Sequence, residues 1–262
     1  MGAAIWSCPT ATFKQFPIRF IIKFYHNHGL LSLRDRPTWR VIRGGSRNYV
    51  DTLTKPFRDR VRLNTPVSGV ARLDDCVKVR TGDSEADKFD EVIFACHSNQ
   101  ALRILGNDAT VAERDVLFAI PYEANTAVLH TDTSLLPKRR RAWASWNYHI
   151  PAGESNHATL TYNMNILQHI ESPETVCVTL NEDAAIAPEK ILATFHYSHP
   201  VFTTQRAAAQ SRHSELIRAN RTSFCGAYWG NGFHEDGVNS AIAVADSFAM
   251  QVETTSESMS HA

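Results

Sequence analysis

The chain has 262 residues, of which 43% are hydrophobic and 21% charged, as in an ordinary folded protein with a sizeable core. Its 27 lysines and arginines balance 27 aspartates and glutamates, so no global field favours nucleic acid, and we expect no nucleic-acid partner. Five scattered cysteines without a C-x-x-C pair predict reduced thiols in a cytoplasmic protein. The sequence shows neither a secretory signal pattern nor an apolar run long enough to span a membrane.

The first predicted element is a helix between residues 11 and 33, broken near Pro17 and ended near Gly29. Phenylalanines recur along it at helical spacing, at Phe13, Phe16, Phe20 and Phe24, between lysines and arginines. The pattern favours a helix that turns its aromatic face to a core. The alternative is a basic, aromatic helix that lies on a membrane or lines an acyl channel.

Residues 39–42 have the pattern of a strand, and Gly44 and Gly45 predict a turn. A helix then follows from Arg47 to near Pro56. A double glycine before a helix is typical of a tight turn, and it can also seat a ligand against backbone N–H groups.

Residues 66–73, 76–81 and 89–96 predict three strands with a polar hairpin tip between the last two. The run from Glu91 to Cys96 is apolar enough for a strand buried on both faces. A helix over residues 98–105 follows, with Ser98 or Asn99 as its N-cap.

The middle of the chain predicts an antiparallel sheet. Alternating segments occur at residues 124–132, 141–150, 157–167 and 176–181, and a further strand or irregular segment at 189–203. Residues 204–217 resemble a connector that contains some helix.

The C-terminal part predicts a short strand at residues 223–229, a glycine-rich loop and a helix from Asp236 onward. One face of this helix carries Val238, Ala241, Ile242, Ala245 and Phe248. A helix N-terminus offers unpaired N–H groups and a partial positive charge, which suit a ligand with developing negative charge. Glycines used for packing alone are the alternative.

Other site types find little support. The histidines near His26, His196 and His234 lack zinc-ligand spacing, so we expect no metal site. Neither a G-x-S-x-G elbow nor a G-x-G-x-x-G dinucleotide fingerprint occurs, and no catalytic residue is assigned.

Four segments follow one another along the chain in the order found in a known family: residues 39–53, 61–73, 89–102 and 224–246. Together they resemble the flavin-containing amine oxidase superfamily. The similarity is greatest to a branch of predicted NAD/FAD-binding oxidoreductases associated with cyclopropane or other modified fatty-acid synthesis. It extends from about Phe13 to Phe248.

The resemblance implies FAD as cofactor and a role for several residues. Val67 would contact the adenine through its backbone. The segment of Phe224, Cys225 and Gly226 would run beside the phosphate and ribityl part, with Ala227 as a further cofactor contact. The helix start of Glu235, Asp236, Gly237 and Val238 would face the pyrimidine end of the flavin. The turn of Gly44, Gly45 and Ser46 would lie at the flavin side of the pocket.

The resemblance also predicts the fold class, α/β. A partial FAD-binding domain, lacking its first Rossmann unit, would comprise residues 41–105 and 221–250. An antiparallel-sheet-plus-helix substrate domain would comprise residues 1–40 and 106–220, with a disordered tail at 251–262. Loss of a central strand would expose a neighbouring sheet edge. Ala227 and Ala241 depart from the acid and the glycine that many relatives carry there.

Two functions follow from these observations. The first is a flavin-dependent oxidoreductase that transfers a hydride from a small-molecule or lipid substrate, with an acyl chain favoured. The second is a truncated, catalytically silent homologue that acts at most as a binding module. No sequence feature assigns an oligomeric state.

Overall fold

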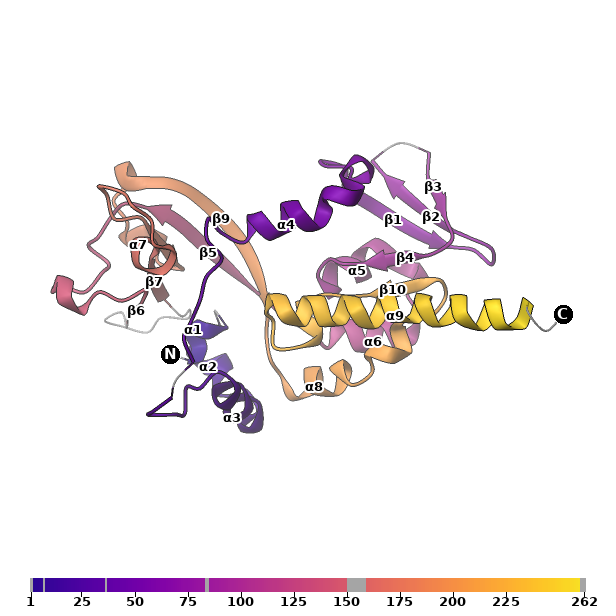
Figure 1. Ribbon diagram of the computed structural model, residues 1–262, viewed down its shortest axis with the longest axis horizontal. Helices are drawn as coiled ribbons and strands as arrows, with labels where there is room; N and C mark the ends of the chain where they lie inside the picture. Colours follow the sequence, from indigo (N-terminus) through magenta and orange to yellow (C-terminus); the bar gives the residue numbers. More distant parts are fainter. Residues whose placement is uncertain (1, 7, 36, 83–84, 150–158, 260–262) are drawn as a thin grey trace. The chain divides into compact units, whose positions relative to one another are not determined.

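The computed structural model describes residues 2–6, 8–35, 37–82, 85–149 and 159–259. The chain forms two compact units (Figure 1). Unit 1 comprises Met1–Val61 and Tyr122–Val201, and unit 2 comprises Arg62–Pro121 and Phe202–Ala262.

Unit 1 begins with three helices around an aromatic cluster. They are α1 (Gly2–Ile5), α2 (Thr10–Phe13) and α3 (Ile18–Asn27). Pro17 is the N-cap of α3, and Gly29, with φ of +64°, follows its C-terminus, so the predicted break and end are confirmed. Trp6 packs on the phenylalanines, with ring centroids 5.6 Å from Phe16 and 4.8 Å from Phe24. The aromatic face of α3 therefore packs inward, as the core-facing interpretation expects.

The predicted strand at residues 39–42 is wrong, because this segment has no regular structure. None of the described strands pairs with this segment, and the Trp39 side chain is 66% exposed. The turn at Gly44 and the helix α4 (Arg47–Thr54) are confirmed, and a 3-10 helix continues the chain through Lys55–Arg60.

The predicted antiparallel sheet is confirmed. Unit 1 contains β5 (Tyr122–His130), β6 (Trp146–His149), β7 (Thr159–Asn163), β8 (Cys177–Leu180) and β9 (Ile191–Pro200), in the order β6-β7-β8-β5-β9. The short helix α7 (Met164–Gln168) follows β7. Residues 150–158, which include part of two predicted strands, lie outside the described residues.

The sheet of unit 1 has a polar centre. The Nε2–H of His130 donates to Thr179 Oγ1 at 2.7 Å, and the Thr179 and Thr161 hydroxyls are 2.8 Å apart. The backbone N–H of Asp132 donates to His130 Nδ1 at 3.1 Å, which fixes the neutral tautomer. Burial lowers the pKa of His130, so the imidazole is uncharged in this network.

Unit 2 contains two small sheets. An antiparallel sheet orders β1 (Val67–Arg72), β2 (Val77–Thr81) and β3 (Asp87–Phe89), and a parallel pair joins β4 (Val92–Phe94) to β10 (Thr222–Phe224). The sequence predicts one strand over residues 89–96, but it is two strands in two different sheets. The break falls at the charged pair Asp90–Glu91, where Glu91 turns to bind Arg218.

Four helices complete unit 2: α5 (Ser98–Leu105), α6 (Val111–Phe118), α8 (Thr204–Gln210) and α9 (His234–Met259). The N-cap of α5 is His97, one residue before the expected position, because His97 and Gln100 form a capping box. A buried ion pair between Arg72 on β1 and Glu113 on α6 joins sheet to helix. Phe94 and Phe224 stack at 5.4 Å between the parallel strands.

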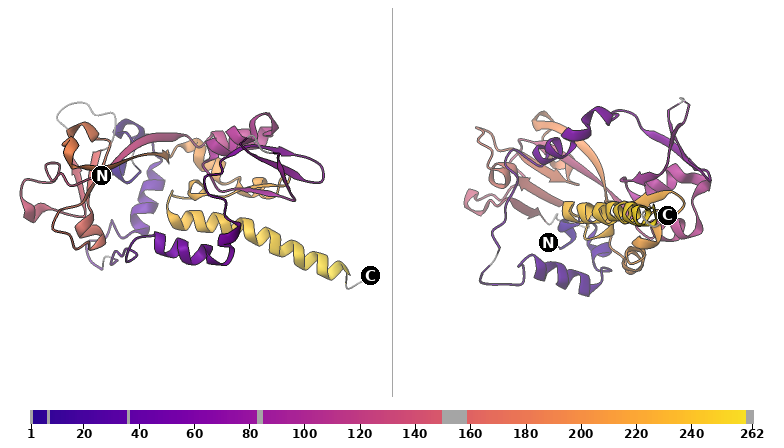
Figure 2. Two further views of the ribbon diagram at one scale, coloured as in Figure 1. Left: turned by 90° about the horizontal axis from the view of Figure 1, so that it is seen from above. Right: turned by 45° about the vertical axis from the view of Figure 1, so that its right-hand side comes forward.

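The compact units differ from the expected domain limits. Residues 41–61 belong to unit 1, whereas α6 packs on α5 and α8 packs on α6, which puts residues 106–121 and 202–220 in unit 2. Helix α9 continues through Met259, into the segment expected to be a disordered tail, and extends away from the rest of unit 2 (Figure 2). Compact units and functional domains need not coincide, so the FAD-side and substrate-side assignments stay predictions.

Candidate functional site

The candidate site lies at one edge of the parallel pair in unit 2. Because β4 and β10 are parallel, with Phe94 opposite Phe224, their carboxyl ends meet at the same edge. Cys96 follows β4 there, and Cys225 follows β10. Ligands of open α/β sheets bind outside the carboxyl ends of the strands, so this edge is the candidate ligand site.

The glycine loop, residues Cys225–Gly232, begins at this edge. Gly226 has φ of +153° and ψ of 161°, a conformation that other residues rarely adopt. A Cβ at Gly226 would lie 2.6 Å from the Tyr228 ring, and one at Gly230 would lie 2.1 Å from an Asp236 carboxylate oxygen. The chain's own packing thus requires both glycines. Glycine content alone is therefore no argument for a ligand here.

Ser240 fastens the N-terminal turn of α9 to the glycine loop. The N–H of Gly226 donates to Ser240 Oγ at 2.8 Å, and the Ser240 hydroxyl lies 2.8 Å from the Gly237 carbonyl oxygen. Ala227 N lies 3.7 Å from the place that a Cβ of Gly237 would take. The predicted segments 225–227 and 235–238 therefore come together, and the long helix points its N-terminus at the edge of the parallel pair.

Three side chains hold the glycine loop from its other side. Arg206 Nη2 donates to the carbonyl oxygens of Tyr228 and Gly230, each at 3.0 Å, and Gln210 Nε2 donates to the same two oxygens, each at 2.8 Å. His213 Nε2–H donates to the Phe224 carbonyl at 2.7 Å. Three carbonyl groups of the segment are thus fixed by α8 and the turn after it.

The electrostatics of the edge combine a helix N-terminus with two carboxylates in its first turn, Glu235 and Asp236. The N-terminus of the 26-residue helix α9 carries partial positive charge. The Asp236 carboxylate accepts from the Phe233 N–H at 2.9 Å and so belongs to the helix start itself. Burial raises the pKa of both Cys96 and Cys225, and each thiol remains neutral near pH 7. Burial also lowers the pKa of His213, so the imidazole is neutral.

An apolar cavity of about 330 Å³ lies beside β4. Its lining comprises Val67, Val70, Val79, Val92, Ile93, Phe94, Ala95, Cys96 and Ile104. Val67, expected to contact an adenine, is therefore at the rim of an apolar space that also reaches Cys96 at the carboxyl edge. Ile93 on β4 is 47% exposed.

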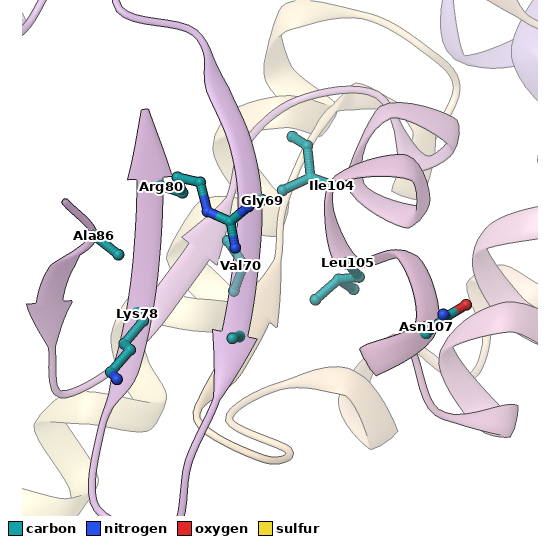
Figure 3. A pocket seen from close by; sticks show the side chains of 9 residues that line it. Gly69, Val70, Lys78, Arg80, Ala86, Ile104, Leu105 and Asn107 are labelled. Atoms are coloured by element: carbon teal, nitrogen blue, oxygen red, sulfur yellow. The ribbon is translucent and has the colours of Figure 1, made fainter. Parts of the chain in front are cut away.

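A second cavity of about 500 Å³ lies between the β1–β2 hairpin and α5 (Figure 3). Lys78 and Arg80 lie on the β2 side, and Ile104, Leu105 and Asn107 on the α5 side. It is more polar than the first cavity, and none of the predicted cofactor residues lines it.

The remaining predicted residues, Gly44, Gly45 and Ser46, belong to unit 1. Gly44 and Gly45 have φ of +76° and +90°, which only glycine adopts readily, and Asn48 closes the turn by donating to the Arg43 carbonyl at 2.7 Å. The tight turn is confirmed. Its contact with a ligand stays a prediction.

The predicted C-terminal helix is confirmed as α9, but most of its apolar face is exposed. Val238 and Ile242 are 49% and 50% exposed, whereas Ser240 and Val244 are buried at 5% and 1%. Ser240 takes the inner position because its hydroxyl oxygen accepts a hydrogen bond from the backbone N–H of Gly226. Neither that bond nor the roles of Arg206, Gln210 and His213 could be predicted from the sequence, because all four side chains act on backbone groups distant in the chain.

A helix N-terminus beside the carboxyl ends of parallel strands is the arrangement with which many α/β proteins bind nucleotide cofactors. Comparison of the sequence with known protein families identifies the particular family. The sequence profile of the flavin containing amine oxidoreductases matches residues 2–139. The chain belongs to this family, and FAD is the cofactor that goes with its fold.

Solved structures of low identity share the fold. Cyclohexylamine oxidase from Brevibacterium oxydans IH-35A has a TM-score of 0.59 at 12% identity, covering 92% of this chain and 61% of its own. The CLA-producing fatty acid isomerase from P. acnes has a TM-score of 0.59 at 13% identity, covering 89% and 59%. A protein provisionally assigned as a protoporphyrinogen oxidase from Exiguobacterium sp. 255-15 has a TM-score of 0.57 at 18% identity, covering 92% and 59%.

The chain thus spans about 60% of the length of these structures. A partial amine-oxidase-like α/β fold, as the sequence predicts, is confirmed. No curated protein sequence matches the chain significantly. Within the described ranges, no helix is both long and apolar enough to cross a membrane, and no three histidine, cysteine or acidic side chains cluster as metal ligands would.

Proposed function

We propose that this chain contributes to an FAD-dependent oxidoreductase, in which a substrate gives a hydride to the flavin. The observation that carries the proposal is the fastening of the α9 N-terminus to the glycine loop at the carboxyl edge of β4 and β10. Membership of the flavin containing amine oxidoreductase family supports it. FAD, when bound, supplies the electron-accepting ring and gains negative charge on reduction.

The residues of this edge fit part of such a cofactor. The N–H groups of Glu235 and Asp236 lie in the first turn of α9, where a helix leaves its donors without intrahelical partners. They would hold the end of the flavin that becomes negative. The apolar cavity beside Val67 would take a flat, weakly polar ring such as an adenine. The glycine loop would let the backbone pass close to the phosphate and ribityl part.

The test is a titration of the purified chain with FAD, followed by flavin absorption and fluorescence quenching. Ser240→Ala removes the bond to Gly226 and should weaken FAD binding about tenfold, the effect of losing one hydrogen bond's positioning. Ser247→Ala is the matched control. Its hydroxyl donates to the Val244 carbonyl one turn back, at 2.6 Å, within α9 itself, and binding should stay within about twofold.

The outcomes separate the two functions. FMN and ADP serve as partial ligands, because each tests one half of the cofactor. Equal effects of the two serine variants would reject the assigned role of the glycine loop. A folded chain that binds neither FAD nor its halves would reject flavin binding by this chain. That result would favour the silent homologue acting as a binding module.

For the substrate, we propose an acyl chain or another lipid. The similarity to a branch associated with modified fatty acids supports this, and so does the fold shared with a fatty acid isomerase. Anaerobic mixing of the FAD-loaded chain with oleate or with cyclohexylamine separates lipid from amine. Bleaching of the flavin by the amine alone would contradict the proposal.

We also infer a cytoplasmic location. All five cysteines are free thiols, and burial raises the pKa of Cys8 and Cys177 to about 11, so neither is poised for exchange. Fractionation of cells that express the chain, with recovery in a secreted fraction, would contradict this.

A further inference from the structure

The N-terminal part of the chain is strongly basic although the whole chain is neutral. Residues 1–50 contain eight lysines and arginines and a single acid, Asp35, a net charge of +7. The remaining residues carry the compensating −7, since the total is zero. A local field of this kind attracts an anionic partner even when the net charge of the protein does not.

Helix α3 turns a second, different apolar face outward. Its phenylalanines pack inward against Trp6, and Ile18 and Ile22, one turn apart, are 69% and 52% exposed. Arg19 and Lys23 lie next to them on the helix and are also exposed. Across the described residues, neither cation has an ion pair or side-chain hydrogen bond. The outer face of α3 therefore presents apolar and cationic side chains together, without acids.

The segment after α3 also exposes apolar side chains, near the C-terminal end of the helix. Leu31 and Leu33 are 56% and 98% exposed, and Trp39 is 66% exposed. The segment folds back on the end of the helix: a Cβ at Gly29 would lie 2.3 Å from Pro37, and the Trp39 ring lies 6.2 Å from that of His28. Figure 2 shows this segment as an open loop beside α3.

These side chains form the α3 surface, which comprises Ile18, Arg19, Ile22, Lys23, Leu31, Leu33 and Trp39. We propose that the α3 surface binds the headgroup region of an anionic phospholipid bilayer. Aliphatic side chains and a tryptophan enter the boundary between headgroups and acyl chains, while lysine and arginine remain beside the phosphates. A nucleic acid would use the same cations but gains nothing from exposed isoleucines and leucines, so the apolar side chains favour the bilayer.

The phenylalanines are not the residues to change. Replacing Phe16 or Phe24, which are 5% and 4% exposed, would disrupt the cluster around Trp6 and test only folding. The informative variants are I18S/I22S, which removes the apolar side chains, and R19E/K23E, which reverses two charges. R80E/K88E is the matched control, since it makes the same charge change on exposed positions of β2 and β3 in unit 2.

The experiment is co-sedimentation of the full chain with phosphatidylcholine vesicles that contain 30 mol% phosphatidylglycerol. Wild type should bind, lose binding in about 0.5 M salt as charges are screened, and bind neutral phosphatidylcholine vesicles at least tenfold more weakly. R19E/K23E should weaken binding at least 25-fold, about fivefold for each cation lost. I18S/I22S should weaken it about tenfold, and R80E/K88E less than twofold.

Several results would overturn the proposal. They are equal binding to neutral vesicles, no binding to either vesicle, or equal loss in the control and R19E/K23E. Retained binding in I18S/I22S, together with tight binding to a DNA duplex, would instead indicate a nucleic-acid partner. Circular dichroism of each variant checks folding, and the salt dependence of wild type tests the charge contribution without any substitution. FAD titration of R19E/K23E should match wild type.

Discussion

The conformation of Gly226 allows a quantitative test of how rigid the candidate site is. Gly226→Ala places a Cβ 2.6 Å from the ring of Tyr228, which is 2% exposed, at a backbone φ of +153°. Gly82→Ala in the same unit is the matched substitution. Gly82 also has positive φ, +58°, but a Cβ there would meet no atom within 4 Å.

The two alanines should differ by several kcal/mol. Gly82→Ala adopts a left-handed conformation at a cost of about 1 kcal/mol. Gly226→Ala costs about 1–3 kcal/mol for its backbone conformation and about 1–3 kcal/mol for the forced contact with Tyr228, roughly 4 kcal/mol together. Adding Tyr228→Ala removes the contact, so the G226A/Y228A double variant should be more stable than the sum of the single variants, by about 1–3 kcal/mol.

The assay is urea unfolding followed by circular dichroism, with the transition of unit 2 followed separately through hydrogen exchange of β4 and β10. A free energy of unfolding for Gly226→Ala within 1 kcal/mol of that for Gly82→Ala would refute the reasoning. The glycine loop would then shift at little cost, and it could not hold the N-terminus of α9 in a fixed place.

Three further substitutions test other parts of the structure. Arg72→Met leaves Glu113, which is 2% exposed, without its cation, and should lower the free energy of unfolding in urea by about 3–5 kcal/mol. The R72M/E113Q double variant should lose clearly less stability than the sum of the two single variants. Phe24→Ala should cost about 3–5 kcal/mol and Ile22→Ala less than about 0.5 kcal/mol, and equal losses in thermal unfolding would contradict the inward orientation of the phenylalanines. Because burial lowers the pKa of His130, the unfolded chain takes up that proton first as pH falls through about 6.5, so stability declines from pH 7 to 5. His130→Gln should reduce this slope by up to about 1.4 kcal/mol per pH unit, and an unchanged slope would show that the imidazole is already protonated in the fold.

The features that the sequence predicts well are those set by local periodicity. Alternation marked β5 and β7–β9, because the side chains of a strand point to its two faces in turn wherever its partner strand lies in the chain, and β5 pairs with β8 and β9 across long separations. Pro17 and Gly29 marked the limits of α3, because the fixed φ of proline and the positive φ of glycine act on the backbone locally. The turn at Gly44 and Gly45 was found for the same reason.

The features that the sequence misses depend on distant partners. Residues 39–42 have strand composition, but a strand needs a neighbour, and this segment has none among the described strands. Residues 89–96 have the composition of one strand, yet β3 pairs with β2 while β4 pairs with β10, more than a hundred residues later. Non-local pairing of this kind leaves no periodic signal in either segment.

In the candidate site, too, the sequence predicts the local features and misses those that depend on distant residues. The family motifs located the glycine loop and the start of α9, but the residues that fix them are a serine, an arginine, a glutamine and a histidine. Each of these acts on a backbone carbonyl or N–H group from another element, as Ser240 does on Gly226. Backbone groups look alike in every sequence, so such bonds cannot be read from residue types. Ser240 and Val244 take the inner positions of α9, and Val238 and Ile242 lie on its exposed face.

The two proposed binding surfaces belong to different units, so it can be tested whether binding at one changes the affinity of the other. The α3 surface belongs to unit 1, and the glycine loop belongs to unit 2. If each binds its ligand independently, saturating FAD leaves the affinity for anionic vesicles unchanged, and vesicles leave the affinity for FAD unchanged. If FAD binding also orders the turn at Gly44 and Gly45 in unit 1, the two affinities must change by the same factor, because binding linkage is reciprocal. Measuring vesicle affinity with and without FAD, in wild type and in Ser240→Ala, distinguishes these cases: a shift that Ser240→Ala abolishes would show that unit 1 contributes to the flavin site.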